Sequence, residues 1–206
     1  MVTSSSPSFA DQERRTLAGL LAEVGPDAPT LCAGWDTAHL VAHLVVRERR
    51  PDALVGLGAE VVGAGGPLAS WPHRLEDRLR GSTPYAEVVD QLRAGPPAWS
   101  PMAWPLLAGP LNTTEFAIHH EDVRRAQPDW TPRKLPRAAQ DALWTAAGLF
   151  SRRAAAGRRG GLVLRRSGVP DQEKRFGDGG TTVVGEPMEL LLWAAGRRDV
   201  ARVTVT

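Results

Sequence analysis

Prolines and glycines divide most of this 206-residue chain into segments of helix length. Proline lacks an amide hydrogen and restricts the residue before it, so a helix that meets one usually ends there. The apolar periodicity between these breaks predicts helices at residues 9–24, 36–50, 82–95, 112–126 and 136–156. The proline-rich stretch that ends at residue 110 is long enough to form a loop over a neighbouring surface. Residues 52–80 show no clear pattern, and their glycine-rich part, 56–66, argues against a helix there.

The pattern changes after Gly157, where short apolar runs replace the long amphipathic ones. These runs predict, in order, strand 161–166, strand 181–184, helix 186–195 and strand 201–206. The GDGG segment at 177–180 is typical of a hairpin turn. We therefore predict a mainly α protein, with a helical bundle over residues 1–157 and a small α/β domain over residues 158–206.

The composition is that of an ordinary globular protein, with 42% hydrophobic residues, 23% charged residues and a net charge of +2. The basic residues form no continuous stripe, so nucleic acid is not an expected partner. The N-terminus lacks the apolar segment of a signal peptide, and the longest charge-free stretch, 95–114, contains too many prolines to span a membrane. A single cysteine, Cys32, excludes an internal disulfide and a zinc site built from several cysteines. We expect a cytoplasmic protein with no membrane partner.

The segment 36–50 is apolar around most of its circumference, but it also carries a polar stripe. Asp36, His39, His43 and Arg47 recur at spacings of three and four residues, which places them on one face of a helix. Polar groups on a largely buried helix must be paired or must line a cavity, because burying them alone is unfavourable.

The segment 112–126 repeats this inverted pattern. Glu115, His119 and Asp122 lie at the centre of its inward face, and apolar residues flank them on both sides. Four other polar residues fall on the opposite face of this helix: Thr114, His120, Glu121 and Arg124. We therefore expect His120 to be exposed, and also His73 in the unpatterned region.

Histidines and carboxylates that project inward from two facing helices have the ligand chemistry of a divalent metal site. A glutamate and a histidine four residues apart place both side chains over one point, and a histidine from another helix would complete three ligands. The remaining coordination positions would stay open for water or substrate, as in catalytic metal sites. The alternative is a buried network of histidines and carboxylates that orders the bundle without a metal.

Three segments resemble one known family. Residues 31–44 (LCAGWDTAHLVAHL) resemble the helix start of the N-terminal domain in mycothiol-dependent maleylpyruvate isomerases, which belong to the DinB-like superfamily of metal-binding four-helix bundles. Residues 115–123 (EFAIHHEDV) resemble the second signature of that domain, and residues 185–197 (GEPMELLLWAAGR) resemble the closing segment of the same architecture. The resemblance implies a DinB-like four-helix bundle followed by a small α/β domain.

The resemblance also implies roles for particular residues. The metal ligands of the family fall on His43, Glu115 and His119, and Asp122 falls on the residue that would orient a ligand imidazole. His39 stands where such proteins more often carry a carboxylate or another polar residue. It could be a fourth ligand, a general base or a packed histidine, and we favour a role other than metal ligand.

The cofactors that the resemblance implies are a divalent metal, with zinc favoured, and a low-molecular-weight thiol such as mycothiol. Metal coordination lowers the pKa of a thiol or a water, so a nucleophile exists at neutral pH. In the isomerase, the thiolate would add to an unsaturated diacid, allow bond rotation and leave, whereas relatives of this fold transfer thiols. The implied function is therefore an isomerase or S-transferase with a small-molecule substrate. Arg47 and Arg197 are candidates for binding its anionic groups, or else form salt bridges at the ends of their elements.

Two other functions stay open. The chain could bind a metal or a small molecule without turning it over, or it could be a structural dimer whose polar stripes form only a network. Bundles of this type often pair, so a homodimer is compatible with each of these functions. Cys32 precedes a predicted helix N-terminus, but without a facing base we expect it to be a small buried apolar residue.

Overall fold

The computed structural model describes residues 7–53, 70–156 and 160–206. The chain divides into two compact units, Met1–Trp130 and Thr131–Thr206. This division places helix Arg137–Ala156 in the second unit, whereas the sequence suggested a boundary after residue 157. The reason is packing, because that helix contacts the strands and the short helix that follow it in the chain.

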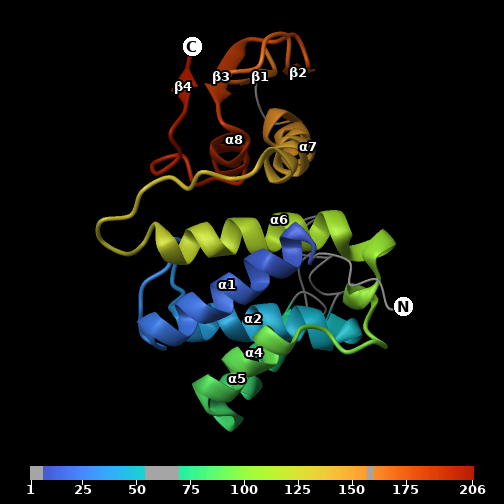
Figure 1. The fold of residues 1–206 in the computed structure, drawn as a ribbon, viewed down its shortest axis with the longest axis vertical. Helices are drawn as coiled ribbons and strands as arrows, with labels where there is room; N and C mark the ends of the chain where they lie inside the picture. Colours follow the sequence, from blue (N-terminus) through green and yellow to red (C-terminus); the bar gives the residue numbers. More distant parts are fainter. Residues whose placement is uncertain (1–6, 54–69, 157–159) are drawn as a thin grey trace. The chain divides into compact units, whose positions relative to one another are not determined.

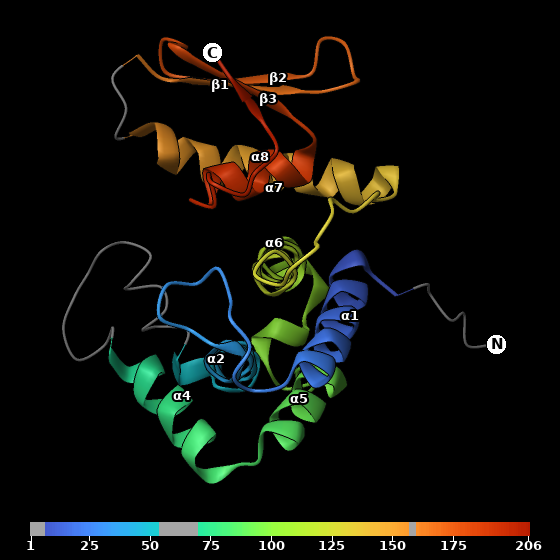
Figure 2. The ribbon, with the colours of Figure 1, turned by 90° about the vertical axis from the view of Figure 1, so that its left-hand side faces the viewer.

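The first unit is helical. Its elements are α1 (Phe9–Val24), α2 (Thr37–Arg49), α4 (Ser70–Ser82), α5 (Tyr85–Ala94), the 3₁₀ helix η1 (Pro101–Ala103) and α6 (Pro105–Arg124). Figures 1 and 2 show α1 packed against α6, with α4 and α5 on the side of α2 away from α6. Helix α2 meets α6 through side chains such as His43 and Arg47. The helices predicted at 9–24, 36–50 and 82–95 are confirmed with small shifts at their ends.

One hydrophobic core joins four of these helices into a bundle. Leu17 of α1, Leu44 of α2, Leu92 of α5 and Phe116 of α6 are all almost completely buried in it. The helix starts agree with local chemistry, since Asp36 caps α2 by accepting a hydrogen bond from the backbone N–H of His39. The mainly α fold expected from the sequence is therefore confirmed.

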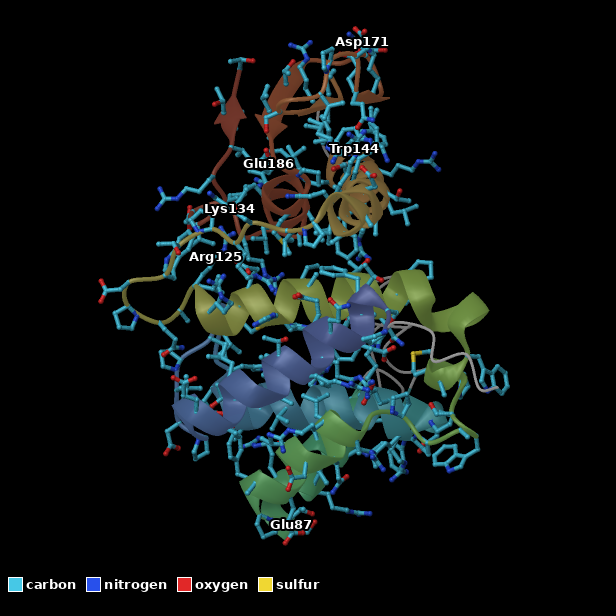
Figure 3. All side chains as sticks on the ribbon, in the orientation of Figure 1. Glu87, Arg125, Lys134, Trp144, Asp171 and Glu186 are labelled. Carbon is cyan, nitrogen blue, oxygen red and sulfur yellow. The ribbon has the colours of Figure 1, made fainter. Side chains whose placement is uncertain are left out.

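The second unit is a two-layer α/β structure. Its elements are α7 (Arg137–Ala156), β1 (Leu162–Arg166), β2 (Glu173–Phe176), β3 (Thr181–Gly185), α8 (Pro187–Ala194) and β4 (Thr204–Val205). The strands form one sheet in the order β2-β1-β3-β4, and α7 and α8 cover one of its faces (Figure 2). Trp144 of α7 meets this sheet, because the ammonium group of Lys174 on β2 donates a hydrogen bond to its carbonyl at 2.9 Å (Figure 3).

Several features of the fold differ from the expectation. Residues 70–82 form α4, although the sequence showed no clear pattern there; the glycine-rich stretch 56–66 lies outside the described residues. Helix α6 begins at Pro105 and continues through Pro110, so the proline-rich loop is shorter than expected. The GDGG segment joins β2 to β3, which are not neighbours because β1 lies between them, so the expected hairpin turn is wrong.

None of the helices in the described part of the chain is long and apolar enough to cross a membrane.

The first unit buries an ionisable residue at the end of α2, Glu48, whose side chain is only 1% exposed. Burial raises the pKa of this carboxyl from its ordinary 4.5 to about 7, although Arg14, Arg47 and Arg49 oppose the shift.

The raised pKa of Glu48 predicts a dependence of stability on pH. Between pH 4.5 and about 7 the folded chain holds a proton on Glu48 that the unfolded chain has released, so stability falls as pH rises through this window. Glu48→Gln, which cannot ionise, should remove this loss, which amounts to about 3 kcal/mol. Urea unfolding of both proteins between pH 4 and 8 measures it, and parallel pH profiles would contradict the burial of an ionisable Glu48.

Candidate metal centre

Two helices of the bundle carry the candidate site. Helix α2 supplies His43, whose neighbours Leu40 and Leu44 are completely buried in the core. Helix α6 supplies Glu115 and His119, which are four residues apart and therefore lie on one face of the helix. Because both helices are held by core side chains, the backbone positions of all three residues are set by packing.

The imidazoles of His43 and His119 converge on the carboxylate of Glu115. Nε2 of His43 lies 3.1 Å from Oε1 of Glu115, and Nε2 of His119 lies 3.4 Å from the same oxygen. The two imidazole rings meet edge to face with their centroids 5.6 Å apart. The site thus presents two nitrogen atoms and one carboxylate oxygen to a common point.

Each of these imidazoles is also held from behind by a carboxylate. Nδ1 of His43 lies 3.0 Å from Oε1 of Glu76 on α4, and Nδ1 of His119 lies 2.9 Å from Oδ2 of Asp122. A carboxylate only accepts hydrogen bonds, so Nδ1 of each ring carries a proton and donates a hydrogen bond to the carboxylate behind it. This arrangement fixes the ring orientation and directs Nε2 into the site, as it does for histidines that bind metals.

The charges of the site are strongly coupled. Burial alone would raise the pKa of Glu115, but Arg47 and the two imidazoles outweigh it and hold the pKa well below the usual range. Burial would likewise lower the pKa of His119, but its hydrogen bonds with Asp122, Cys32 and Glu115 favour the protonated ring and leave the pKa well above the usual value. Without a cation, therefore, protons on Nε2 balance the charge of Glu115, and a metal ion bound there would replace them.

Two of the three separations between the donor atoms are close to those expected around a tetrahedral metal ion. The three donor atoms of His43, Glu115 and His119 all lie within 4.8 Å of one another. Ligand atoms that bind zinc at about 2.0–2.1 Å in tetrahedral geometry are about 3.3 Å apart. The separations of 3.1 and 3.4 Å between Glu115 and the two nitrogens are close to this value. Two nitrogens and one carboxylate oxygen are also a ligand set that zinc accepts.

A second group of possible ligands adjoins the first and shares His119. Sγ of Cys32 lies 3.2 Å from Oδ2 of Asp122 and 3.7 Å from Nδ1 of His119, so these three residues could also hold a cation. The thiol of Cys32 donates to Asp122, which also accepts the Nδ1 proton of His119. In this arrangement Cys32 and Asp122 both support the His119 ring from the side opposite Glu115.

The remaining predicted residues occupy different surroundings. Arg47 borders the site, with Nε 3.7 Å from Oε1 of Glu115, and it donates a hydrogen bond to Oδ1 of Asn112 at 2.8 Å. His39 is about one-third exposed and pairs with the cap residue Asp36 at 2.7 Å; it belongs to neither group of potential ligands in the described chain. Arg197 belongs to the second unit, where its guanidinium donates to the carbonyl of Ala195.

Three residues that contribute to the site do not follow from the sequence pattern. Glu76 lies on α4, which was not predicted, and only its spacing of three residues from His73 hinted at a helix face. Trp35 packs its ring against that of His43, with centroids 5.2 Å apart. Cys32 was expected to be only a small apolar residue, but it contacts Asp122.

The prediction that one face of α6 points to solvent must also be corrected. His120 is 2% exposed rather than solvent-exposed, and its Nδ1 lies 2.9 Å from Oε2 of Glu13 on α1. Thr114 and Glu121 are buried as well. For His120 the reason is that α6 packs against α1, which carries Glu13, in addition to facing α2. The expectation for His73 is confirmed, since its side chain is 49% exposed.

Substitution of the carboxylates that contact Nδ1 of the two histidines should weaken metal binding without abolishing it. Glu76→Gln and Asp122→Asn keep the size of each side chain but weaken its hold on the Nδ1 proton of His43 or His119. Each substitution should weaken metal binding about 10- to 100-fold, which is typical for residues that orient a ligand histidine. Competition with a chelating dye measures the affinity. Glu87→Gln, an exposed carboxylate of α5, is the matched control, and equal affinities in all three variants would contradict the assigned roles.

Known crystal structures share the fold of this chain. No protein-family profile and no curated protein sequence matches the chain. Two crystal structures of the mycothiol-dependent maleylpyruvate isomerase do match. A histidine-to-alanine mutant superposes with a TM-score of 0.56 at 21% identity, and a second structure with a TM-score of 0.54 at 20% identity. Each match covers 98% of this chain and 96% of the other, so the shared fold extends over both units.

Proposed function

We propose that this chain, which has the fold of the mycothiol-dependent maleylpyruvate isomerase, is a metal-dependent enzyme that uses a low-molecular-weight thiol as an isomerase or S-transferase. The observation that supports this proposal most strongly is the pair of imidazoles whose Nε2 atoms face Glu115 while carboxylates hold their Nδ1 atoms. A polar network that served only to order the bundle would not need both nitrogens of each ring to be aligned in this way.

His43, Glu115 and His119 are the proposed ligands, and zinc is the favoured metal because of the mixed nitrogen and oxygen donor set. A bound zinc ion would supply Lewis-acid chemistry that lowers the pKa of a coordinated thiol or water. Glu76 and Asp122 keep the Nδ1 protons on the ligand rings, which leaves both Nε2 atoms available for the metal.

Other residues of the chain would handle the substrate. Arg47 carries a permanent positive charge beside Glu115, and its hydrogen bond to Asn112 holds the guanidinium in place. It is therefore suited to bind a carboxylate of a small anionic substrate. His39 is the proposed general base, since Asp36 holds its Nδ1 and leaves Nε2 to accept a proton.

The experiment that tests this function is an isomerisation assay with zinc-loaded protein, mycothiol and maleylpyruvate. We expect conversion that needs both the metal and the thiol. An isomerase would leave the thiol concentration unchanged, whereas an S-transferase supplied with an electrophile would consume it. Arg47→Met should mainly raise KM if Arg47 binds the substrate, and His39→Gln should lower kcat if His39 moves a proton.

Metal binding without turnover is the competing outcome. A protein that retains zinc but shows no thiol-dependent reaction with an unsaturated diacid or an electrophile would support a metal-bearing binding protein instead. A third function, a structural dimer with a polar network, is compatible with the direct contacts between imidazoles and carboxylates. Failure to bind metal, together with a dimeric mass in solution, would support that one.

A further inference from the structure

A half-exposed histidine on α4 shares a carboxylate with one of the proposed metal ligands. Oε2 of Glu76 lies 3.1 Å from Nδ1 of His73, and the other oxygen, Oε1, lies 3.0 Å from Nδ1 of His43. Among the described residues, His73 belongs to neither group of potential metal ligands. One carboxylate therefore joins a histidine of the metal centre to a histidine at the molecular surface.

The three side chains differ in their access to solvent. The side chain of His73 is 49% exposed, whereas those of Glu76 and His43 are 8% and 12% exposed. A contact between two exposed groups contributes little, because water can replace either partner. Here the acceptor is a buried carboxylate, and a buried acceptor that loses its donor is left without a full replacement from water. The contact with His73 is therefore more than a surface pair.

Core packing fixes the turn of α4 that carries both residues. His73 and Glu76 are three residues apart, which places them on one face of the helix. Leu75 lies in the same turn, is 5% exposed and packs with Val46 of α2 in a small hydrophobic cluster. The backbone of this turn is thus held against the helix that supplies His43, so the contact between His73 and Glu76 requires no further ordering of the chain.

Both histidines keep Glu76 in its ionised form. Burial raises the pKa of this carboxyl, but the hydrogen bonds and charges of His43 and His73 outweigh burial and hold the pKa below its usual value. A carboxylate only accepts hydrogen bonds, so Nδ1 of His73 also carries a proton and donates it to Oε2. Each oxygen of Glu76 therefore has its own imidazole donor.

We propose that His73 is a positioning residue of the metal centre, which holds Oε2 of Glu76 and thereby keeps Oε1 on Nδ1 of His43. This inference rests on the proposed function, because it concerns a ligand of the same metal. The last torsion of a glutamate side chain has broad minima, so a carboxylate held at one oxygen can still rotate. A donor at the second oxygen restricts that rotation, and the His43 ring then keeps Nε2 directed at the metal. His73 itself contacts neither the metal nor the substrate.

Two substitutions of His73 in the full chain test this role. His73→Phe keeps a ring but removes the donor, and it should weaken zinc binding about threefold, as expected for loss of a half-exposed pair. His73→Asn carries an amide N–H group close to the position of Nδ1 and should restore the affinity of the wild type. Arg74→Gln, at the neighbouring exposed position of α4, is the control and should bind zinc like the wild type. Competition with a chelating dye at one fixed pH measures all four proteins.

A double-mutant cycle shows whether His73 acts through Glu76. Glu76→Met removes both acceptor oxygens, so adding His73→Phe to it should cause no further loss of zinc affinity. An equal loss from His73→Phe in both backgrounds, or wild-type affinity in His73→Phe alone, would overturn the proposal. The readout is independent of turnover. A wild type that binds zinc with this coupling but catalyses no thiol-dependent reaction would reject the proposed function and support the role of His73.

Discussion

Replacement of Glu115 by alanine should give a folded protein that no longer retains a divalent metal. Glu115 is the one proposed ligand whose carboxylate oxygen meets both imidazoles, at 3.1 and 3.4 Å. Its loss removes the only proposed anionic ligand and leaves two neutral nitrogens, with Arg47 beside them. Loss of a residue that merely orients a ligand costs about 10- to 100-fold in affinity, so loss of the ligand itself should exceed 100-fold.

Elemental mass spectrometry of untagged protein, before and after reconstitution with zinc, nickel or manganese, measures this effect. The wild type should carry close to one metal ion per chain, and Glu115→Ala close to none. Glu115→Gln is the second variant, because its amide keeps the size of the side chain and its contacts to the histidines. Glu87→Ala is the matched control for loss of a carboxylate, and it should bind metal like the wild type. Equal metal content in Glu115→Ala and the wild type would reject the assigned ligands.

Replacement of Leu44 by alanine should produce a large loss of stability. Leu44 is completely buried between α1, α5 and α6, one residue after the proposed ligand His43. A buried leucine truncated to alanine loses its transfer free energy and leaves a cavity, which together cost about 2–5 kcal/mol. Because α2 presents His43 to α6, this change should also weaken metal binding, even though no ligand is altered.

Urea unfolding followed by far-UV circular dichroism measures the loss. Leu111→Ala is the matched control, since Leu111 is 57% exposed on α6 and its truncation should change stability by no more than about 0.5 kcal/mol. Similar unfolding midpoints for the two variants would show that α2 does not form the centre of the bundle core.

Local patterns in the sequence were sufficient for most of the helices. The breaks at Gly25, Arg50 and Gly95 end helices where the chain predicts them, because proline and glycine act on the backbone of the residues beside them. The start of α6 was not predicted. Pro105 occupies the first turn of that helix, where its missing N–H group is not needed. The proline that we interpreted as a helix breaker therefore marks the start of a helix.

The strands likewise depend partly on the local sequence and partly on contacts with residues far away in the chain. Short apolar runs predicted β1 and β3, whereas β2, with the sequence EKRF, has no apolar run and exists because it pairs with β1. The GDGG turn has hairpin chemistry, but β3 runs parallel to β1 instead of pairing with β2. Which strands are neighbours depends on packing against α7 and α8, and no turn sequence encodes that.

For the candidate site, the sequence by itself determined which side chains α2 and α6 present on their inward faces. The helical repeat places His43 on one face of α2, and Glu115 and His119 on one face of α6, whatever lies opposite. Only the tertiary structure brought Glu76 from α4 behind His43, placed Cys32 beside Asp122, and buried Glu48 beside Arg14. The physical reason is that helical periodicity extends over a few turns, whereas the contact between His43 and Glu76 joins residues 33 positions apart and depends on how the core packs.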